Sequence, residues 1–211
     1  MLNATVRTGL FGRMRESSGL PALAYPLPAA ERVAVVGARL RAEPGVRSFP
    51  HWSTADLEAW NPQALAGPRS ELFAMGALRR QGYLTLPDLR FPLVVLSSLP
   101  EGPLTSPQHE RLWYLFELPV FEQIRGTDEA LLGWECDARD GWHLACHQDG
   151  TPKLTLNELR TAGWQGVQLR AFCGCGKTCH RLIVEQVFPH RARAATAGRA
   201  APDASSLLYA S

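Results

Sequence analysis

Two apolar segments flank an amphipathic one near the middle of the chain. Residues 91–96 (FPLVVL) are apolar at consecutive positions, which is typical of a strand buried on both faces of a sheet. Residues 105–116 place their large apolar side chains on one side of a predicted helix, and residues 119–124 (PVFEQI) predict a second strand. This strand–helix–strand order indicates a parallel βαβ unit, and therefore an α/β fold.

Weaker patterns precede this unit. Residues 70–81 have helical spacing, with Ser70 as a predicted N-cap after Pro68, and Ser53 is a predicted N-cap for a helix that begins nearby. Residues 30–42 fit either a helix or a buried strand, because a short apolar run does not distinguish the two.

The C-terminal part of the chain has a more β-like pattern. Strands are expected over residues 131–137, 142–147, 166–172 and 181–187, with one helix over residues 155–162. We expect residues 1–28 to form a flexible arm, residues 29–189 a single α/β domain, and residues 190–211 a disordered tail rich in Ala, Arg and Gly.

Charge and composition argue against a nucleic-acid-binding, membrane-spanning or secreted protein. The net charge is only +2, and no basic patch is interleaved with aromatic residues, so we expect no nucleic-acid partner. The apolar runs are too short to cross a membrane, and the N-terminus lacks the apolar segment of a secretory signal. We therefore expect a cytoplasmic protein, whose five cysteines are reduced and available to bind a metal.

Four residues have the chemistry of a zinc site. Cys136 and His143 flank an Asp-Gly turn, and Cys173 and Cys175 form a Cys-Gly-Cys pair, in which Gly174 and Gly176 would let the backbone curl. Zinc favours four tetrahedral thiolate and imidazole ligands. Because the protein would then fill every coordination position, this Zn²⁺ would be structural.

The spacing leaves the choice of ligands open. His143 is preferred to His147 only for its position beside the Asp-Gly turn. Cys146, Cys179 and His180 also lie close enough in the sequence to replace one of the four or to lie just outside them.

Several of these segments resemble, in the same order, the motifs of one enzyme family. They are Pro68-Arg69-Ser70 with Leu72, Leu96-Ser97-Ser98 through Glu101, Leu104-Thr105-Ser106-Pro107-Gln108 through Phe116, Pro119-Val120-Phe121, Glu135-Cys136-Asp137-Ala138-Arg139-Asp140-Gly141-Trp142-His143, and Cys173-Gly174-Cys175-Gly176-Lys177-Thr178. The family is that of the phenylacetate–coenzyme A ligases, which are adenylate-forming enzymes, and the resemblance covers about residues 65–185.

The resemblance implies a partial adenylate-forming-ligase-like α/β layer. In some members of the family, the corresponding Cys, His and Cys-x-Cys residues hold zinc. For this chain the resemblance implies a zinc ion that clips a β-rich segment onto the α/β layer.

The motifs that serve catalysis in the family are degraded in this chain. The Ser/Thr/Gly-rich phosphate loop, the ribose-binding Asp and the domain with the catalytic lysine are not recognisable. The motif beside the adenylate survives only as Gly126 and Glu129, so binding of ATP or AMP is doubtful. The expected function is that of a catalytically inactive accessory or interaction protein, beside a full-length acyl ligase. The alternative is one part of a split acyl- or aryl-CoA ligase that a complementary chain completes.

Other motifs have simpler explanations. Gly176-Lys177-Thr178 lacks the earlier glycine of a phosphate-binding loop and precedes a predicted strand. The acidic residues Glu101, Glu122 and Glu129 are expected to be solvated rather than to act as acid/base pairs. The tryptophans are expected in the core or against the zinc, except that Trp142, if exposed, would mark a partner surface. They are Trp113, Trp134, Trp142 and Trp164.

Overall fold

A mixed sheet runs through the described part of the chain. The computed structural model describes residues 22–23, 30–41, 43–170, 173–176 and 179–184. The nine strands of the sheet follow the order β2-β1-β3-β4-β5-β6-β7-β9-β8. They are β1 (Val33–Val36), β2 (Val46–Phe49), β3 (Ala64–Gly67), β4 (Leu93–Ser98), β5 (Val120–Arg125), β6 (Leu131–Glu135), β7 (Trp142–Leu144), β8 (Val167–Arg170) and β9 (Arg181–Val184).

The first half of the sheet is parallel. Strands β2, β1, β3, β4 and β5 pair in the same direction, and Leu93 of β4 lies opposite Val120 of β5. The predicted βαβ unit is therefore confirmed, with helix α3 (Ser106–Phe116) as its crossover. The ambiguous segment 30–42 contains strand β1, whose residues are all buried. Ala34 and Val36 pack in the core that includes the helices, and Val33 and Val35 pack in a second cluster on the other face.

The second half of the sheet is antiparallel. Strand β6 turns back on β5, and β7, β9 and β8 continue the sheet from there. The predicted β-rich segment is thus joined to the α/β layer by the hydrogen bonds between β5 and β6.

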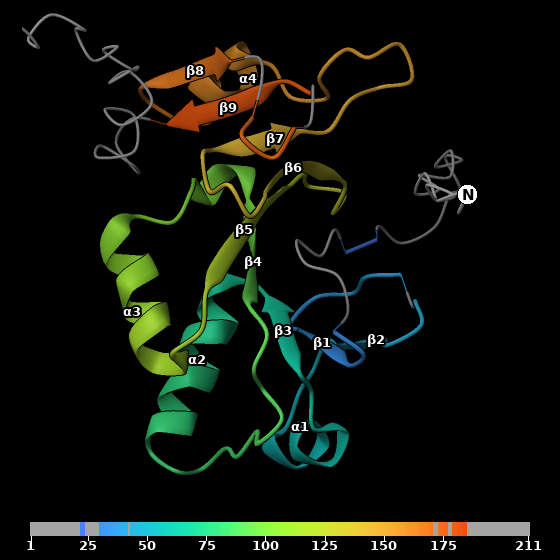
Figure 1. Cartoon of the computed structure of the whole chain (residues 1–211), viewed down its shortest axis with the longest axis vertical. Helices are drawn as coiled ribbons and strands as arrows, with labels where there is room; N and C mark the ends of the chain where they lie inside the picture. The colour runs from blue at the N-terminus through green and yellow to red at the C-terminus, as the bar shows by residue number, and fades with distance from the viewer. Residues whose placement is uncertain (1–21, 24–29, 42, 171–172, 177–178, 185–211) are drawn as a thin grey trace, which may run out of the picture.

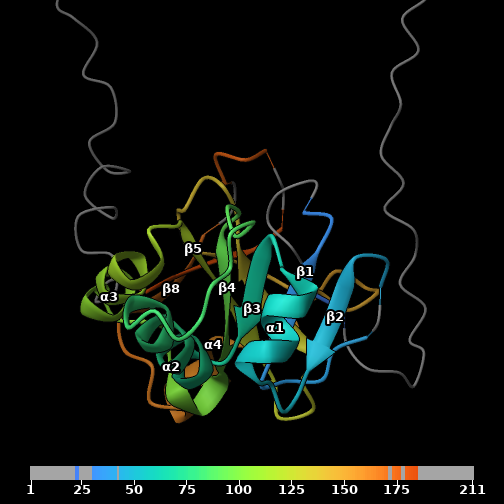
Figure 2. The same cartoon turned by 90° about the horizontal axis from the view of Figure 1, so that it is seen from below.

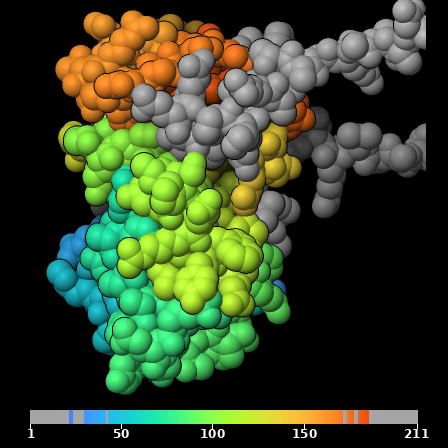
Figure 3. Space-filling model, turned by 90° about the vertical axis from the view of Figure 1, so that its left-hand side faces the viewer, coloured from blue at the N-terminus to red at the C-terminus, as the bar shows by residue number. Residues whose placement is uncertain are grey.

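Helices cover one face of the parallel half. Helices α1 (Thr54–Trp60), α2 (Arg69–Arg80) and α3 lie on the same side of the strands (Figures 1 and 2) and share one apolar core with them. Figure 3 shows the face on which the side chains of α3 protrude, between α2 and the strands of the second half. Helix α4 (Leu156–Thr161) packs with β7, β8 and β9 in a separate core around Trp142 and Trp164.

The first residues of α1 and α2 test the two N-caps predicted from the sequence. The Ser53 hydroxyl accepts a hydrogen bond from the Asp56 N–H and caps α1 as predicted. The prediction for Ser70 is wrong, because the N-cap of α2 is Pro68 and the helix already includes Arg69. Within the described residues, no helix is both long and apolar enough to cross a membrane.

Candidate metal centre and a neighbouring pocket

The β6–β7 turn brings the first two cluster residues together. Cys136 follows directly after β6, and His143 is the middle residue of β7. Gly141 closes the turn with φ +95°, and a Cβ atom there would lie 2.3 Å from the Leu182 carbonyl oxygen. Only glycine fits this position, so the Asp-Gly sequence fixes the separation of Cys136 and His143.

The loop between β8 and β9 supplies the other two cysteines. The Cys173 carbonyl accepts a hydrogen bond from the Gly176 N–H at 3.0 Å, which folds the Cys-Gly-Cys sequence into a turn. Gly176 has φ +80°, a conformation that favours glycine, whereas Gly174 is not among the residues with positive φ. Of the two glycines predicted to curl the backbone, Gly176 has the conformation that requires glycine.

The four side chains converge on one point. The ligand atoms of Cys136, His143, Cys173 and Cys175 all lie within 4.8 Å of one another. The Cys136 and Cys173 sulfurs are 3.5 Å apart, and the Cys175 sulfur lies 3.3 Å from His143 Nε2. A tetrahedral zinc ion separates its sulfur and nitrogen ligands by about 3.5–3.8 Å. This buried Cys3His cluster therefore has the donor set and spacing that could hold a metal ion.

Two neighbours orient the His143 ring. The Cys179 sulfur lies 2.8 Å from Nδ1, so Nε2 is the nitrogen that faces the cluster. The Trp134 ring stacks on the imidazole from the paired strand, with centroids 5.6 Å apart. A metal-bound histidine commonly donates its other N–H to an acceptor that fixes its tautomer, and Cys179 occupies that place.

Hydrogen bonds within the cluster favour thiolate at one sulfur. Burial and the nearby Cys173 thiol raise the pKa of Cys136 to about 12. At Cys173, burial is outweighed by hydrogen bonds from the Cys175 backbone and from the Cys136, Cys175 and Arg181 side chains, which lower its pKa overall. Arg181 is itself buried and paired with Asp140 of the β6–β7 turn.

The competing ligands lie outside the cluster of four. The half-buried Cys146 thiol donates to the Leu144 carbonyl, and His147 and His180 are exposed. Cys179 contacts His143 but does not join the four converging atoms.

The cluster joins different parts of the chain from those that the family resemblance implies. All four residues lie in the antiparallel half, between the β6–β7 turn and the β8–β9 loop. The cluster therefore cross-links the β-rich segment internally and does not clip it onto the α/β layer, because the β5–β6 pairing already makes that junction.

The remnant of the adenylate motif forms a hairpin turn. Gly126 and Glu129 lie between β5 and β6, where the Glu129 N–H bonds the Gly126 carbonyl and the Glu129 side chain is exposed. Arg125 stands where the family motif has an aromatic residue. Its buried guanidinium donates to the carbonyl oxygens of Glu129 and Ala22 and to the Gln123 side chain.

The structure also shows where the glutamates and tryptophans singled out in the sequence lie. Among the glutamates, Glu122 is completely buried, contrary to the prediction, while Glu101 and Glu129 are exposed.

Two tryptophans, Trp142 and Trp164, pack edge to face in the core, so Trp142 marks no partner surface. Trp134 flanks the cluster as predicted. Trp113 is 58% exposed, so its assignment to the core is wrong. Lys177 and Thr178 lie outside the described residues.

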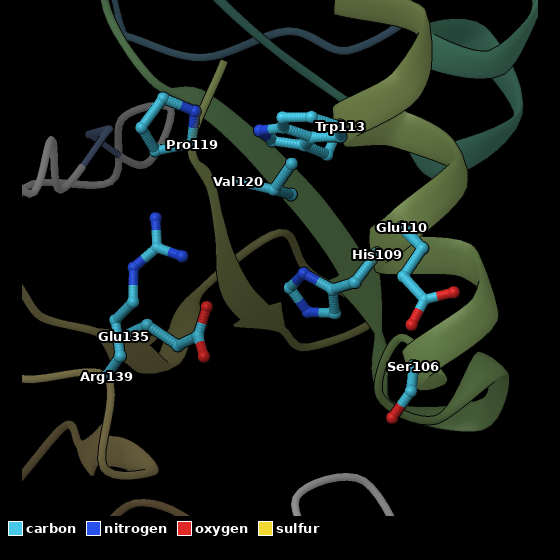
Figure 4. A pocket seen from close by; sticks show the side chains of 8 residues that line it. All are labelled: Ser106, His109, Glu110, Trp113, Pro119, Val120, Glu135 and Arg139. Atoms are coloured by element: carbon cyan, nitrogen blue, oxygen red, sulfur yellow. The ribbon is translucent and has the colours of Figure 1, made fainter. Parts of the chain in front are cut away.

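A pocket of about 290 Å³ lies beside the β6–β7 turn, which begins with Cys136 (Figure 4). Its walls combine one face of α3 with the start of β5, the end of β6 and the turn. The lining residues are Ser106, His109, Glu110, Trp113, Pro119, Val120, Glu135 and Arg139. Sequence reasoning did not single out this pocket, because its parts come from segments that are distant along the chain.

Comparisons with known proteins give a partial likeness among solved structures. The chain matches no protein-family model and no curated protein. Among solved structures it is similar to an open conformation of 2-hydroxyisobutyryl-CoA ligase in complex with 2-HIB-AMP and CoA, with 13% identity and a TM-score of 0.41. The match covers 55% of this chain and only 30% of the ligase chain. A likeness this partial does not establish a family, and function is therefore argued from the site itself.

Proposed function

We propose that this chain is a zinc-stabilised α/β module that acts as an accessory or interaction protein rather than as a free-standing ligase. The observation that carries the proposal is the buried Cys3His cluster. Three sulfurs and one imidazole nitrogen within 4.8 Å of one another favour zinc over the hard cations, which prefer oxygen ligands.

The number of ligands supports a structural role for the ion. Four protein side chains fill the coordination positions of tetrahedral zinc, which leaves none for water or substrate. The ion would hold the β6–β7 turn against the β8–β9 loop. Cys136, Cys173 and His143 are buried, so separating these residues would also expose their side chains to water.

The accessory role is inferred from the loss of motifs that a ligase needs for catalysis. Transfer of an acyl group to AMP requires preorganised donors around the developing charge on the phosphate. The printed sequence has no recognisable phosphate loop, and a buried arginine with internal partners stands at the adenylate motif. A full-length acyl ligase is the partner class that the sequence motifs suggest.

Matched cysteine variants test the metal. Cys173→Ser should lose the zinc, and its free energy of unfolding should fall by about 4 kcal/mol if free zinc exceeds Kd by about 1,000-fold. Cys146→Ser should keep the zinc and the full free energy of unfolding, because this thiol lies outside the cluster. Zinc content by mass spectrometry and denaturant unfolding measure the two effects, and full zinc occupancy in Cys173→Ser would refute the assignment.

A ligase assay tests the accessory role. The purified chain, supplied with ATP, CoA and phenylacetate, should form neither AMP nor an acyl-CoA. Turnover by the chain alone would contradict the proposal. Turnover only after mixing with a second chain would instead support the alternative, a split acyl- or aryl-CoA ligase, which the order of the sequence motifs favours.

A further inference from the structure

The pocket between α3 and the β6–β7 turn contains opposite charges at its inner end and an aromatic ring at its rim. Glu135 and Val120 are buried and form the floor, His109 and Arg139 are half-buried, and Trp113 is exposed. Its volume of about 290 Å³ is near the lower end of the roughly 300–1,000 Å³ of small-molecule pockets. The space therefore suits a compact ligand.

The charged groups are held in place by the protein. Glu135 Oε2 accepts a hydrogen bond from the Glu122 N–H at 2.9 Å, which fixes the carboxylate at the floor. Arg139 has φ +49°, unusual for a residue other than glycine, and its guanidinium lies 4.6 Å from the centre of the Phe121 ring. The ring contact holds the guanidinium of Arg139, which lines the pocket.

The opposite wall comes from one stripe of α3. Ser106, His109, Glu110 and Trp113 recur at helical spacing, while the buried Leu112 and Phe116 lie on the face of α3 that packs into the core. Figure 4 shows Glu135 and Arg139 on one side of the hollow, with His109 facing them and the Trp113 ring near Pro119. The helix stripe thus lines the pocket and is not needed for the core.

We propose that this pocket binds a free α-amino acid with an aromatic side chain. The Glu135 carboxylate would accept hydrogen bonds from the ammonium group, and the Arg139 guanidinium would donate to the carboxylate. The aromatic side chain would pack on Trp113, Pro119 and Val120. A carboxylic acid without an ammonium group would instead meet the buried Glu135 carboxylate, and an amine without a carboxylate would accept no hydrogen bond from Arg139.

Titration calorimetry on the full chain, as purified with its metal, tests the ligand class. The probes are L-phenylalanine, 3-phenylpropionate, which lacks the ammonium group, and phenethylamine, which lacks the carboxylate. L-Phenylalanine should bind at least about tenfold more tightly than either analogue, since each charged pair is worth about 1.4 kcal/mol or more. No heat of binding at about 1 mM L-phenylalanine, or equal binding of 3-phenylpropionate, would overturn the proposal.

Two variants and one control locate the site. Arg139→Gln and Trp113→Ala should each weaken binding of L-phenylalanine by about tenfold or more. Tyr114→Ala should leave it unchanged, because Tyr114 is an equally exposed aromatic residue of α3 that does not line the pocket. Unfolding curves of all three variants check that they are folded, and unchanged affinity in both pocket variants would refute the location. The calorimetry measures binding of L-phenylalanine and the mass spectrometry measures zinc, so failure of this proposal can be told apart from failure of the proposed metal.

Discussion

At the scale of single residues, Cys179 shows how a side chain can matter without being a ligand. The sequence left it as a competitor for the metal, whereas its sulfur lies on the far nitrogen of the His143 ring. An acceptor at Nδ1 holds the proton there and leaves the Nε2 lone pair for the ion. Cys179 is therefore a positioning residue for the proposed zinc.

Removing this acceptor should weaken metal binding without abolishing it. We expect Cys179→Ala to raise the Kd for zinc by about 10- to 100-fold, the usual cost of losing such a contact. Cys179→Ser keeps a hydroxyl acceptor and should recover part of the affinity. Competition with a chromophoric chelator measures both values. If Cys179→Ala lost zinc as completely as Cys173→Ser, Cys179 would be a ligand and the assignment of the four would be wrong.

At the scale of elements, Glu122 links two strands and a loop. It lies on β5, and its Oε1 accepts hydrogen bonds from the Ser97 hydroxyl of β4 and from the Leu104 N–H. Within the described residues, its Oε2 has no hydrogen-bond partner. Burial raises the pKa of Glu122 to about 7, against the lowering effect of the Ser97 and Leu104 hydrogen bonds. The folded protein therefore holds a proton here that the unfolded chain releases.

This proton makes stability depend on pH. Between pH 4.5 and about 7 the unfolded chain has lost the proton that the folded protein keeps, so the free energy of unfolding falls as pH rises. Each pKa unit corresponds to about 1.4 kcal/mol, so the total is about 3 kcal/mol. Glu122→Gln cannot ionise and should lack this loss. Urea unfolding of both proteins at several pH values measures the difference, and a difference that stays constant with pH would contradict the buried, protonated carboxyl.

Most elements could be predicted from the sequence, including the short strands β7, β8 and β9, whereas β2 and β3 could not. Residues 91–96 and 105–116 carry strong apolar patterns, and the structure contains β4 and α3 there. Strands β2 and β3 have four residues each, and β3 (ALAG) has no β-branched residue, so neither stands out locally. They form because neighbouring strands pair with them and bury their residues, which is a tertiary effect.

At the scale of the whole molecule, the candidate site was easier to predict than its place in the fold. Cysteine and histidine are distinctive in the sequence, and the structure brings Cys136, His143, Cys173 and Cys175 together. Local spacing could not show which loops the cluster would join, because that depends on the strand order β6-β7-β9-β8. The pocket at the β6–β7 turn escaped prediction for the same reason.

The strand order also indicates what the proposed metal would do in the whole molecule. The parallel half is held by helices α1, α2 and α3, whereas the antiparallel half has only the short helix α4 and its own small core among the described elements. A zinc ion would stabilise the half that has the smaller core. This explains why loss of the metal should destabilise β6, β7, β8 and β9 first.

X-ray absorption spectroscopy at the zinc edge of the purified chain tests the central claim most directly. The account predicts about one zinc per chain with three sulfur ligands near 2.3 Å and one nitrogen ligand near 2.0–2.1 Å. A protein without zinc, or a zinc shell that contains water or carboxylate oxygen in place of one of the sulfurs, would contradict a closed Cys3His centre formed by Cys136, His143, Cys173 and Cys175.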